Sequence, residues 1–186
     1  MGVKTFNLKL TILGEPAVGK TSLRKRYLGQ GFSTEYLATL GADFAIHSSI
    51  TSGVEIRFQI WDIAGQMKFN TITKSFFIGS QASMVVFDVT NRSIDSVLGW
   101  IRELWTFNGK GKIPVVVIGN KIDLRNEVES ALTAQDGKDL TAAIEKEAGF
   151  PVPYLETSAK TGENVEAAFD LIRKQFFSFY KVKAPK

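Results

Sequence analysis

Cysteine is absent from the 186 residues of this chain, and long apolar runs are missing as well. The lack of cysteine excludes disulfides, cysteine-ligated zinc sites, thiol nucleophiles and cysteine-linked lipids in this sequence. The longest apolar runs, such as Val115–Ile118, are far too short to cross a bilayer. The first residues form neither a signal-peptide core nor a myristoylation motif, because Phe6 stands where that motif requires Ser or Thr. We therefore expect a cytoplasmic protein, peripheral to membranes only if a longer natural form is lipidated.

The body of the chain has no excess of positive charge, and the excess lies near the end of the sequence. The 23 Lys and Arg residues and 19 Asp and Glu residues give a net charge of +4. Residues 173–186 contain five basic residues and no acidic one, which leaves 18 of the 23 basic residues and all 19 acidic ones before Arg173. The near-neutral body predicts no nucleic-acid partner. The basic end predicts at most a weak, reversible contact with an anionic membrane.

The length corresponds to about one domain, and we predict a single domain over residues 1–180 followed by a basic tail over 181–186. The segments that read as strands are 6–13, 44–50, 54–60, 84–89, 115–118 and 152–156. Those that read as helices are 21–28, 94–105, 133–147 and 165–179. Residues 51–53 are typical of a hairpin turn, and Thr133 and Asp136 have the spacing of a capping box. The alternation predicts an α/β fold with a mainly parallel sheet and helices on both faces.

A phosphate-binding sequence follows the first predicted strand. Residues 14–21 read Gly-Glu-Pro-Ala-Val-Gly-Lys-Thr, which matches G-x-x-x-x-G-K-[ST], and a helix is predicted directly after them. The glycines let the backbone wrap phosphate oxygens, and the helix N-terminus adds positive potential. Lys20 is predicted to reach the β- and γ-phosphates, and the Thr21 hydroxyl to ligate Mg²⁺. The plainer alternative is a glycine-rich turn with a solvated lysine.

Two further motifs stand at the ends of predicted strands. Residues 120–123 read Asn-Lys-Ile-Asp, and the Asp123 carboxylate can accept two hydrogen bonds from guanine, whereas adenine offers no such donor pair. The alternative is a strand-terminating turn. Residues 62–65 read Asp-Ile-Ala-Gly, and an Asp at a strand's carboxyl end can hold Mg²⁺ through water. Gly65 is predicted to donate its N–H to the γ-phosphate, and Gln66 to orient the attacking water.

Taken together, these motifs resemble the small GTPases of the Ras superfamily, and the Rab branch most closely, from about Leu8 to Phe179. Further Rab-like stretches cover residues 32–44, 61–66 and 155–165. The resemblance implies a P-loop G-domain with a six-stranded, mostly parallel sheet, one antiparallel edge strand and about five helices. It also implies binding of GTP or GDP and Mg²⁺, with switch I at about 31–43 and switch II at about 63–79.

The resemblance assigns roles residue by residue. Gln66 and Lys20 are matched to catalysis. The positions matched to nucleotide contacts are Gly14, Glu15, Ala17, Val18, Gly19, Lys20, Thr21, Ser22, Phe32, Tyr36, Thr39, Gly65, Asn120, Lys121, Asp123, Ser158, Ala159 and Lys160. Those matched to Mg²⁺ are Thr21, Thr39 and Asp62. The Ala159 N–H is expected to face the guanine O6, and Phe44, Trp61 and either Phe76 or Phe77 are expected to form an effector patch.

The predicted function is a monomeric GTP-hydrolysing switch that binds effectors in its GTP state, in membrane traffic or a related regulatory role. An exchange factor and a GTPase-activating protein are the expected regulators. No arginine precedes Thr39 in the predicted switch I, so we expect slow intrinsic hydrolysis. Pro16 and Met67 depart from the family pattern, and they motivate one alternative, a nucleotide-locked scaffold with negligible hydrolysis. The other alternative is a P-loop ATPase or kinase.

Overall fold

A computed structural model describes residues 4–30, 41–51, 54–65 and 71–181 of the chain. Its strands are β1 (Lys4–Leu13), β2 (Ala42–Thr51), β3 (Val54–Ile63), β4 (Ala82–Asp88), β5 (Val115–Asn120) and β6 (Tyr154–Thr157). They form one sheet in the order β2-β3-β1-β4-β5-β6, in which only β2 runs antiparallel to its neighbour. The predicted mostly parallel sheet with one antiparallel edge strand is confirmed.

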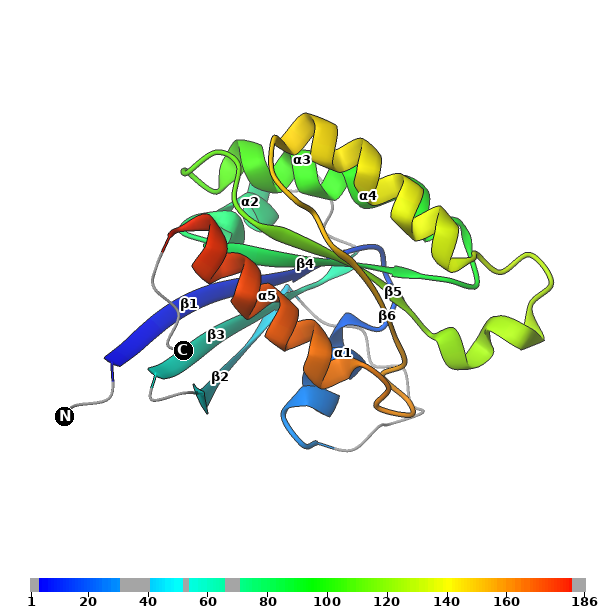
Figure 1. Ribbon diagram of the computed structural model, residues 1–186, viewed down its shortest axis with the longest axis horizontal. Helices are drawn as coiled ribbons and strands as arrows, with labels where there is room; N and C mark the ends of the chain where they lie inside the picture. Colours follow the sequence, from blue (N-terminus) through cyan, green and yellow to red (C-terminus); the bar gives the residue numbers. More distant parts are fainter. Residues whose placement is uncertain (1–3, 31–40, 52–53, 66–70, 182–186) are drawn as a thin grey trace.

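Five α-helices are present in the described part of the chain: α1 (Lys20–Tyr27), α2 (Thr71–Phe77), α3 (Val97–Phe107), α4 (Ala134–Ala148) and α5 (Val165–Phe179). Figure 1 shows α1 and α5 on one face of the sheet and α2, α3 and α4 on the other. Two short 3₁₀ segments, η2 (Arg92–Ser96) and η3 (Ile122–Glu127), follow β4 and β5. The predicted layers of helices on both faces are therefore confirmed.

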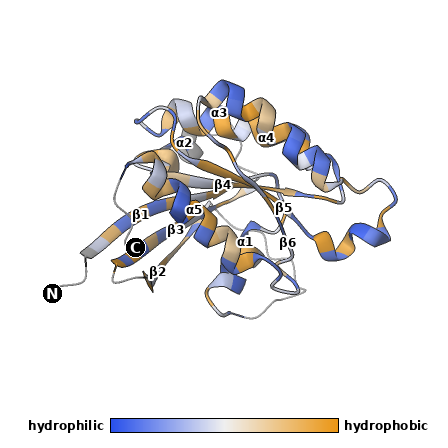
Figure 2. Ribbon diagram, in the orientation of Figure 1, coloured by the Kyte–Doolittle hydropathy of each residue, from blue (hydrophilic) through white to orange (hydrophobic). Residues whose placement is uncertain are grey.

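The sheet separates two hydrophobic cores. Side chains of β1, β3 and β4 pack with α1 and α5 on one face, and those of β4 and β5 pack with α3 and α4 on the other. Every residue of β4 and β5 is buried, as expected for parallel strands covered on both faces. Figure 2 shows the hydrophobic colour along these central strands and the hydrophilic colour on the outward sides of the helices.

Short sequence signals explain where several helices begin and end. Thr133 and Asp136 form the predicted capping box at the start of α4, and Gly149 ends that helix in the left-handed region with φ of 81°. The predicted helix over 94–105 is divided into η2 and α3, because the Asn91 side chain caps the 3₁₀ turn at Ser93. The sequence does not predict helix α2, since seven residues are too few to display a clear apolar period.

Candidate functional site

The predicted phosphate loop lies between the end of β1 and the start of α1, and its shape requires glycine. Gly14 has φ of 138°, and a Cβ there would lie 2.1 Å from the Val86 carbonyl oxygen. Gly19 has φ of 98°, and a Cβ there would lie 2.3 Å from Asn120 Nδ2. Ala17 also adopts a left-handed conformation, with φ of 62°, where a side chain costs about 1 kcal/mol.

Lys20 is folded back over this loop. Its Nζ donates to the carbonyl oxygens of Gly14 and Glu15, both at 2.8 Å. The residue is 6% exposed, and burial lowers the pKa of Lys20 to about 8, although the carboxylates of Asp62 and Glu15 partly oppose this shift. An ammonium group held in this way is oriented before any phosphate arrives.

Thr21 and Asp62 meet beside Lys20. The Thr21 hydroxyl donates to Asp62 Oδ2 at 2.5 Å, and Asp62 is fully buried at the end of β3. Burial raises the pKa of Asp62, opposed by the Thr21 hydrogen bond and by the positive charges of Lys20 and Arg24. The second oxygen, Oδ1, has no hydrogen-bond partner among the described residues, although it is buried. An orphaned carboxylate oxygen next to a threonine hydroxyl suits a water-coordinated Mg²⁺, so these residues fit the metal.

Gly65 lies against the phosphate loop. A Cβ at Gly65 would come within 2.4 Å of both the Glu15 carbonyl carbon and the Pro16 nitrogen, so only glycine fits at this point. The parallel pairing of β1 and β3, with Ile12 opposite Asp62, brings the two motifs to the same edge of the sheet.

Asn120 joins three segments of the site. Its Nδ2 donates to the Val18 carbonyl oxygen at 2.9 Å. Its Oδ1 accepts from the Thr157 hydroxyl at 3.1 Å and from the Ala159 N–H at 3.2 Å. The residue is 1% exposed. The Asn120 side chain therefore connects the phosphate loop to the segment that follows β6. The Ala159 N–H, which was expected to face guanine, donates a hydrogen bond to Asn120.

The remaining predicted base-contacting residues lie close together. The Ser158 hydroxyl donates to Asp123 Oδ1 at 2.6 Å, and Lys160 Nζ lies 3.9 Å from Asp123 Oδ2. Lys121 has φ of 68°, and its ammonium forms an ion pair with Asp88 Oδ2 at 2.7 Å. This pair holds the Lys121 stem at the carboxyl ends of β4 and β5.

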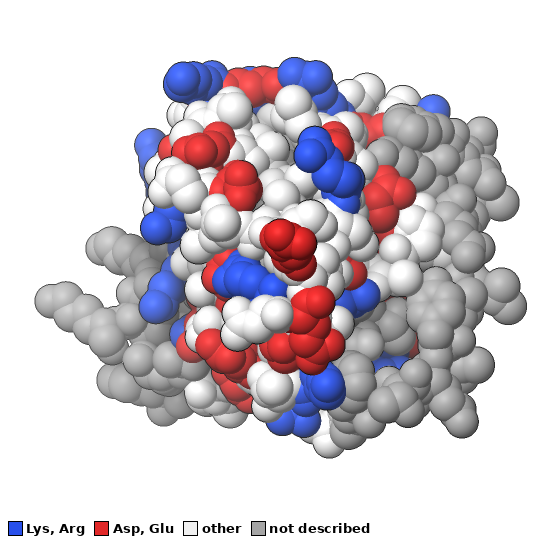
Figure 3. Space-filling view, turned by 90° about the vertical axis from the view of Figure 1, so that its right-hand side faces the viewer, with Lys and Arg blue, Asp and Glu red and all other residues white. Residues whose placement is uncertain are grey.

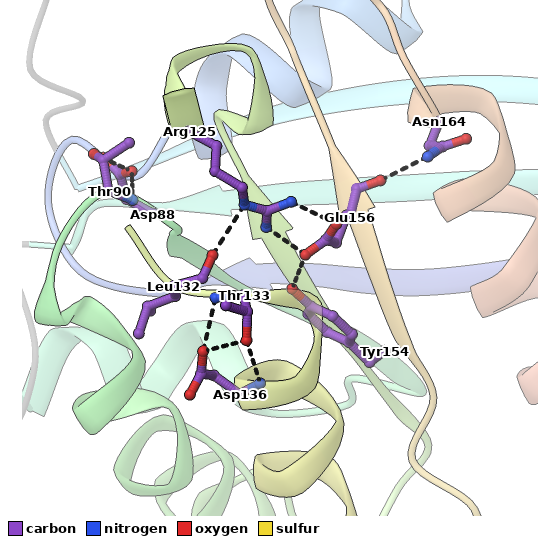
Figure 4. A network of polar contacts seen from close by, with 9 residues as sticks. All are labelled: Asp88, Thr90, Arg125, Leu132, Thr133, Asp136, Tyr154, Glu156 and Asn164. Atoms are coloured by element: carbon purple, nitrogen blue, oxygen red, sulfur yellow. Dashed lines mark hydrogen bonds and ion pairs between the residues drawn. The ribbon is translucent and has the colours of Figure 1, made fainter. Parts of the chain in front are cut away.

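Sequence reasoning missed a polar network next to the segments predicted to contact the base, drawn in Figure 4. The Arg125 guanidinium donates to both carboxylate oxygens of Glu156, at 3.0 and 2.5 Å, and to the Leu132 carbonyl oxygen at 2.9 Å. The Tyr154 hydroxyl donates to the same carboxylate at 2.9 Å, and Asn164 Nδ2 donates to the Glu156 carbonyl oxygen at 2.9 Å. The one sign of this network in the sequence is Glu156, the first residue of the Rab-like stretch Glu-Thr-Ser-Ala-Lys.

A second contact was also missed, because it joins residues 85 positions apart. Trp100, fully buried on α3, donates its indole N–H to Glu15 Oε1 at 3.2 Å. This hydrogen bond attaches the phosphate loop to α3, which covers the face of the sheet opposite to α1 (Figure 1). Four predicted residues, Phe32, Tyr36, Thr39 and Gln66, lie outside the described part of the chain, as does Met67.

Three aromatic side chains form a row across β2, β3 and α2. The ring centroids of Phe44 and Trp61 are 4.9 Å apart, and those of Trp61 and Phe76 are 5.8 Å apart. Phe77 is fully buried, whereas Phe44 is 45% exposed. The third ring of the row is therefore Phe76. We call Phe44, Trp61 and Phe76 the aromatic row.

Charge is mixed on the end of the molecule that carries η3 and the start of α4. Figure 3 shows acidic and basic side chains interleaved over the described part of this face. Within the described residues, no helix has both the length and the apolar character needed to span a membrane.

Comparison with known proteins agrees with this geometry. A profile of the Ras family matches residues 9–178. Ras-related protein Rab7 of Drosophila melanogaster is 38% identical over 178 residues, covering 93% of this chain and 82% of the fly protein. GTP-binding protein yptV5 of Volvox carteri is 40% identical over 171 residues, covering 90% and 80%. Human Ras-related protein Rab-8B is 36% identical over 169 residues, covering 89% and 77%. The chain therefore belongs to the Ras family as a Rab-type small GTPase, a guanine-nucleotide-binding switch that hydrolyses GTP.

Proposed function

We propose that this protein holds GTP or GDP with Mg²⁺ at the carboxyl edge of its sheet and that the GTP form binds effectors, as Rab-type proteins do. The observation that supports this most strongly is the meeting of four separated motifs at one place. The phosphate loop, Asp62–Gly65, Asn120–Asp123 and Ser158–Lys160 are joined there by the hydrogen bonds of Thr21, Asn120 and Ser158.

The phosphate end is assigned as follows. The residues proposed to contact phosphate are Gly14, Glu15, Ala17, Val18, Gly19, Lys20, Thr21, Ser22, Tyr36 and Gly65. Thr21 and Thr39 would ligate Mg²⁺ directly, and Asp62 would hold it through water. When bound, Mg²⁺ neutralises charge on the β- and γ-phosphate oxygens. Lys20, already oriented by two carbonyl groups, supplies further positive charge to the oxygens of the transferred phosphoryl group.

The part of the site proposed to hold the base distinguishes guanine from adenine through Asp123. Ser158 holds one carboxylate oxygen of Asp123, so the group is fixed in orientation before it accepts from the base. Asn120 sets the distance between this end and the phosphate loop. The Lys121 stem and Phe32 are proposed to cover the ring faces, and the Ala159 N–H to share its donor between Asn120 and the guanine O6, with Lys160 beside them.

Gln66 is proposed to orient the water that attacks the γ-phosphate. Replacing Gln66 with Leu should slow single-turnover GTP hydrolysis in Mg²⁺ by about tenfold or more, since the side chain loses its hydrogen-bonding groups. The affinity for GTP should be unchanged. Equal hydrolysis rates in both proteins would contradict this role, and the absence of measurable hydrolysis in the wild type would favour the nucleotide-locked scaffold.

Lys20 makes nucleotide binding dependent on pH. Because the pKa of Lys20 is lowered to about 8, most Lys20 side chains are neutral at pH 9, and nearby phosphate favours the charged form. GDP binding at pH 9 should therefore take up as much as about one proton, and binding at pH 7 almost none from this group. Titration calorimetry in two buffers of different ionisation enthalpy measures this uptake. Equal uptake at both pH values would show that Lys20 is not the titrating group.

The aromatic row is proposed as the effector surface of the GTP state. It spans β2 and β3, which adjoin the predicted switches, and α2, which lies within the predicted switch II, so its geometry would follow their rearrangement. Exchange factors and activators would approach the same side of the molecule. The basic residues from Arg173 to Lys186 are proposed to make at most a weak contact with anionic membrane.

The nucleotide that remains bound through purification tests the proposal directly. Guanine nucleotide, retained in Mg²⁺ and released by EDTA, is the expected result. Adenine nucleotide in the protein, or displacement of labelled GTP by excess ATP, would contradict it and favour a P-loop ATPase or kinase.

A further inference from the structure

Arg24 lies beside the proposed metal end of the site. Its side chain is 6% exposed on α1, one turn after Lys20. One end of the guanidinium forms an ion pair with Asp43 at the start of β2. Its Nε lies 3.9 Å from Asp62 Oδ2 and has no hydrogen-bond partner among the described residues. A buried arginine thus lies between two carboxylates, one of which is the proposed metal-facing group.

The two carboxylates would repel each other without a cation between them. Asp43 and Asp62 are direct partners in the antiparallel pairing of β2 and β3. Like charges placed opposite each other in a sheet are destabilising, and Asp62 is fully buried. Lys20 is also close, but its ammonium is held by the carbonyl groups of the phosphate loop. Arg24 is therefore the cation that lies near both carboxylates, while Lys20 also stabilises the charge of Asp62.

We propose that Arg24 is a built-in positive charge that weakens Mg²⁺ binding at Asp62 and keeps the site stable when the metal is absent. The inference rests on the proposed assignment of Asp62 to the metal. A guanidinium stays charged at all accessible pH values, so it opposes a divalent cation at the same carboxylate permanently. A relatively high concentration of free Mg²⁺ is then needed before the metal slows nucleotide release.

The test measures release of fluorescent GDP from the 186-residue chain over a series of free Mg²⁺ concentrations. Arg24→Leu should lower the Mg²⁺ concentration at half-effect by about fivefold or more, since a repelling charge is removed. Asp43→Asn should raise it, because a negative charge is lost and Arg24 is freed to approach Asp62. Lys25→Leu is the matched control, since it removes one positive charge from the same helix, and its midpoint should stay within about twofold of the wild type.

Thermal unfolding without nucleotide gives a second measurement. In EDTA, Arg24→Leu should melt below the wild type, whereas Arg24→Lys, which keeps the charge, should melt closer to it. If Arg24→Leu does not fold, the opposite shift expected for Asp43→Asn still tests the inference. A wild-type midpoint in Arg24→Leu or Asp43→Asn would overturn the role of Arg24 alone. If the rate of GDP release from the wild type did not change with Mg²⁺ concentration, the assignment of Asp62 to the metal would be contradicted, and the inference with it.

Discussion

Replacing Asp123 with Asn should lower GDP affinity by about a hundredfold or more and allow xanthosine diphosphate to bind in its place. The asparagine oxygen can still accept from the Ser158 hydroxyl, which now reaches Asp123 Oδ1 at 2.6 Å. The amide nitrogen then faces the base as a donor. Guanine presents donors at that edge, so two donors would oppose each other, whereas xanthine carries a carbonyl oxygen at C2.

Displacement of labelled GDP by unlabelled GDP or by unlabelled xanthosine diphosphate measures this change of specificity. Asp139→Asn is the matched control, because Asp139 is an exposed aspartate on α4 whose carboxylate accepts a hydrogen bond from Gln135. It should leave both affinities unchanged. If Asp123→Asn bound neither GDP nor xanthosine diphosphate, Asp123 would be stabilising the loop rather than recognising the base.

Replacing Asn120 with Ala should lower both the stability of the protein and its affinity for nucleotide. The change leaves the Val18 carbonyl oxygen, the Thr157 hydroxyl and the Ala159 N–H without their present partner. Each of the three unsatisfied buried groups costs about 1–3 kcal/mol, so the free energy of unfolding should fall by at least about 3 kcal/mol. For a domain of this size a loss of about 3 kcal/mol lowers the melting temperature by about 6–12 °C.

Asn108 supplies the control, since it is equally buried and equally well bonded but lies away from the site. Its Nδ2 donates to the carbonyl oxygens of Leu104 and Gly111, at 2.6 and 2.7 Å, and its exposure is also 1%. Asn108→Ala should cost comparable stability and leave GDP affinity nearly unchanged. Equal losses of affinity in both variants would mean that Asn120 acts only through global stability.

The parts of the fold that could be predicted are those governed by short-range chemistry. The strands show apolar runs, the capping box of α4 lies within four residues, and the glycines of the phosphate loop follow from backbone geometry. The motifs could be located in the sequence because each is a short run of adjacent residues. Parallel strands share one carboxyl edge, so motifs that follow such strands are expected to meet at that edge.

The rest depends on contacts between distant segments. Nothing in the residues around Arg125 indicates that its partner is Glu156, and nothing near Trp100 indicates Glu15. The choice between Phe76 and Phe77 depended on which side of α2 faces Trp61, and a seven-residue helix is too short to fix that rotation from its sequence. Arg24 reads as an ordinary basic residue on a helix until the pairing of β2 and β3 places two aspartates beside it.

The Arg125–Glu156 pair has a consequence for the lifetime of the bound nucleotide. Glu156 is held by η3 through Arg125 and by the start of α5 through Asn164, so the two segments proposed to contact the base, which lie beside Arg125 and Glu156, share one anchor. They should open in a single concerted event rather than by separate fluctuations. A partner that pulls on η3 or on the start of α5 would then shorten the residence time of the base.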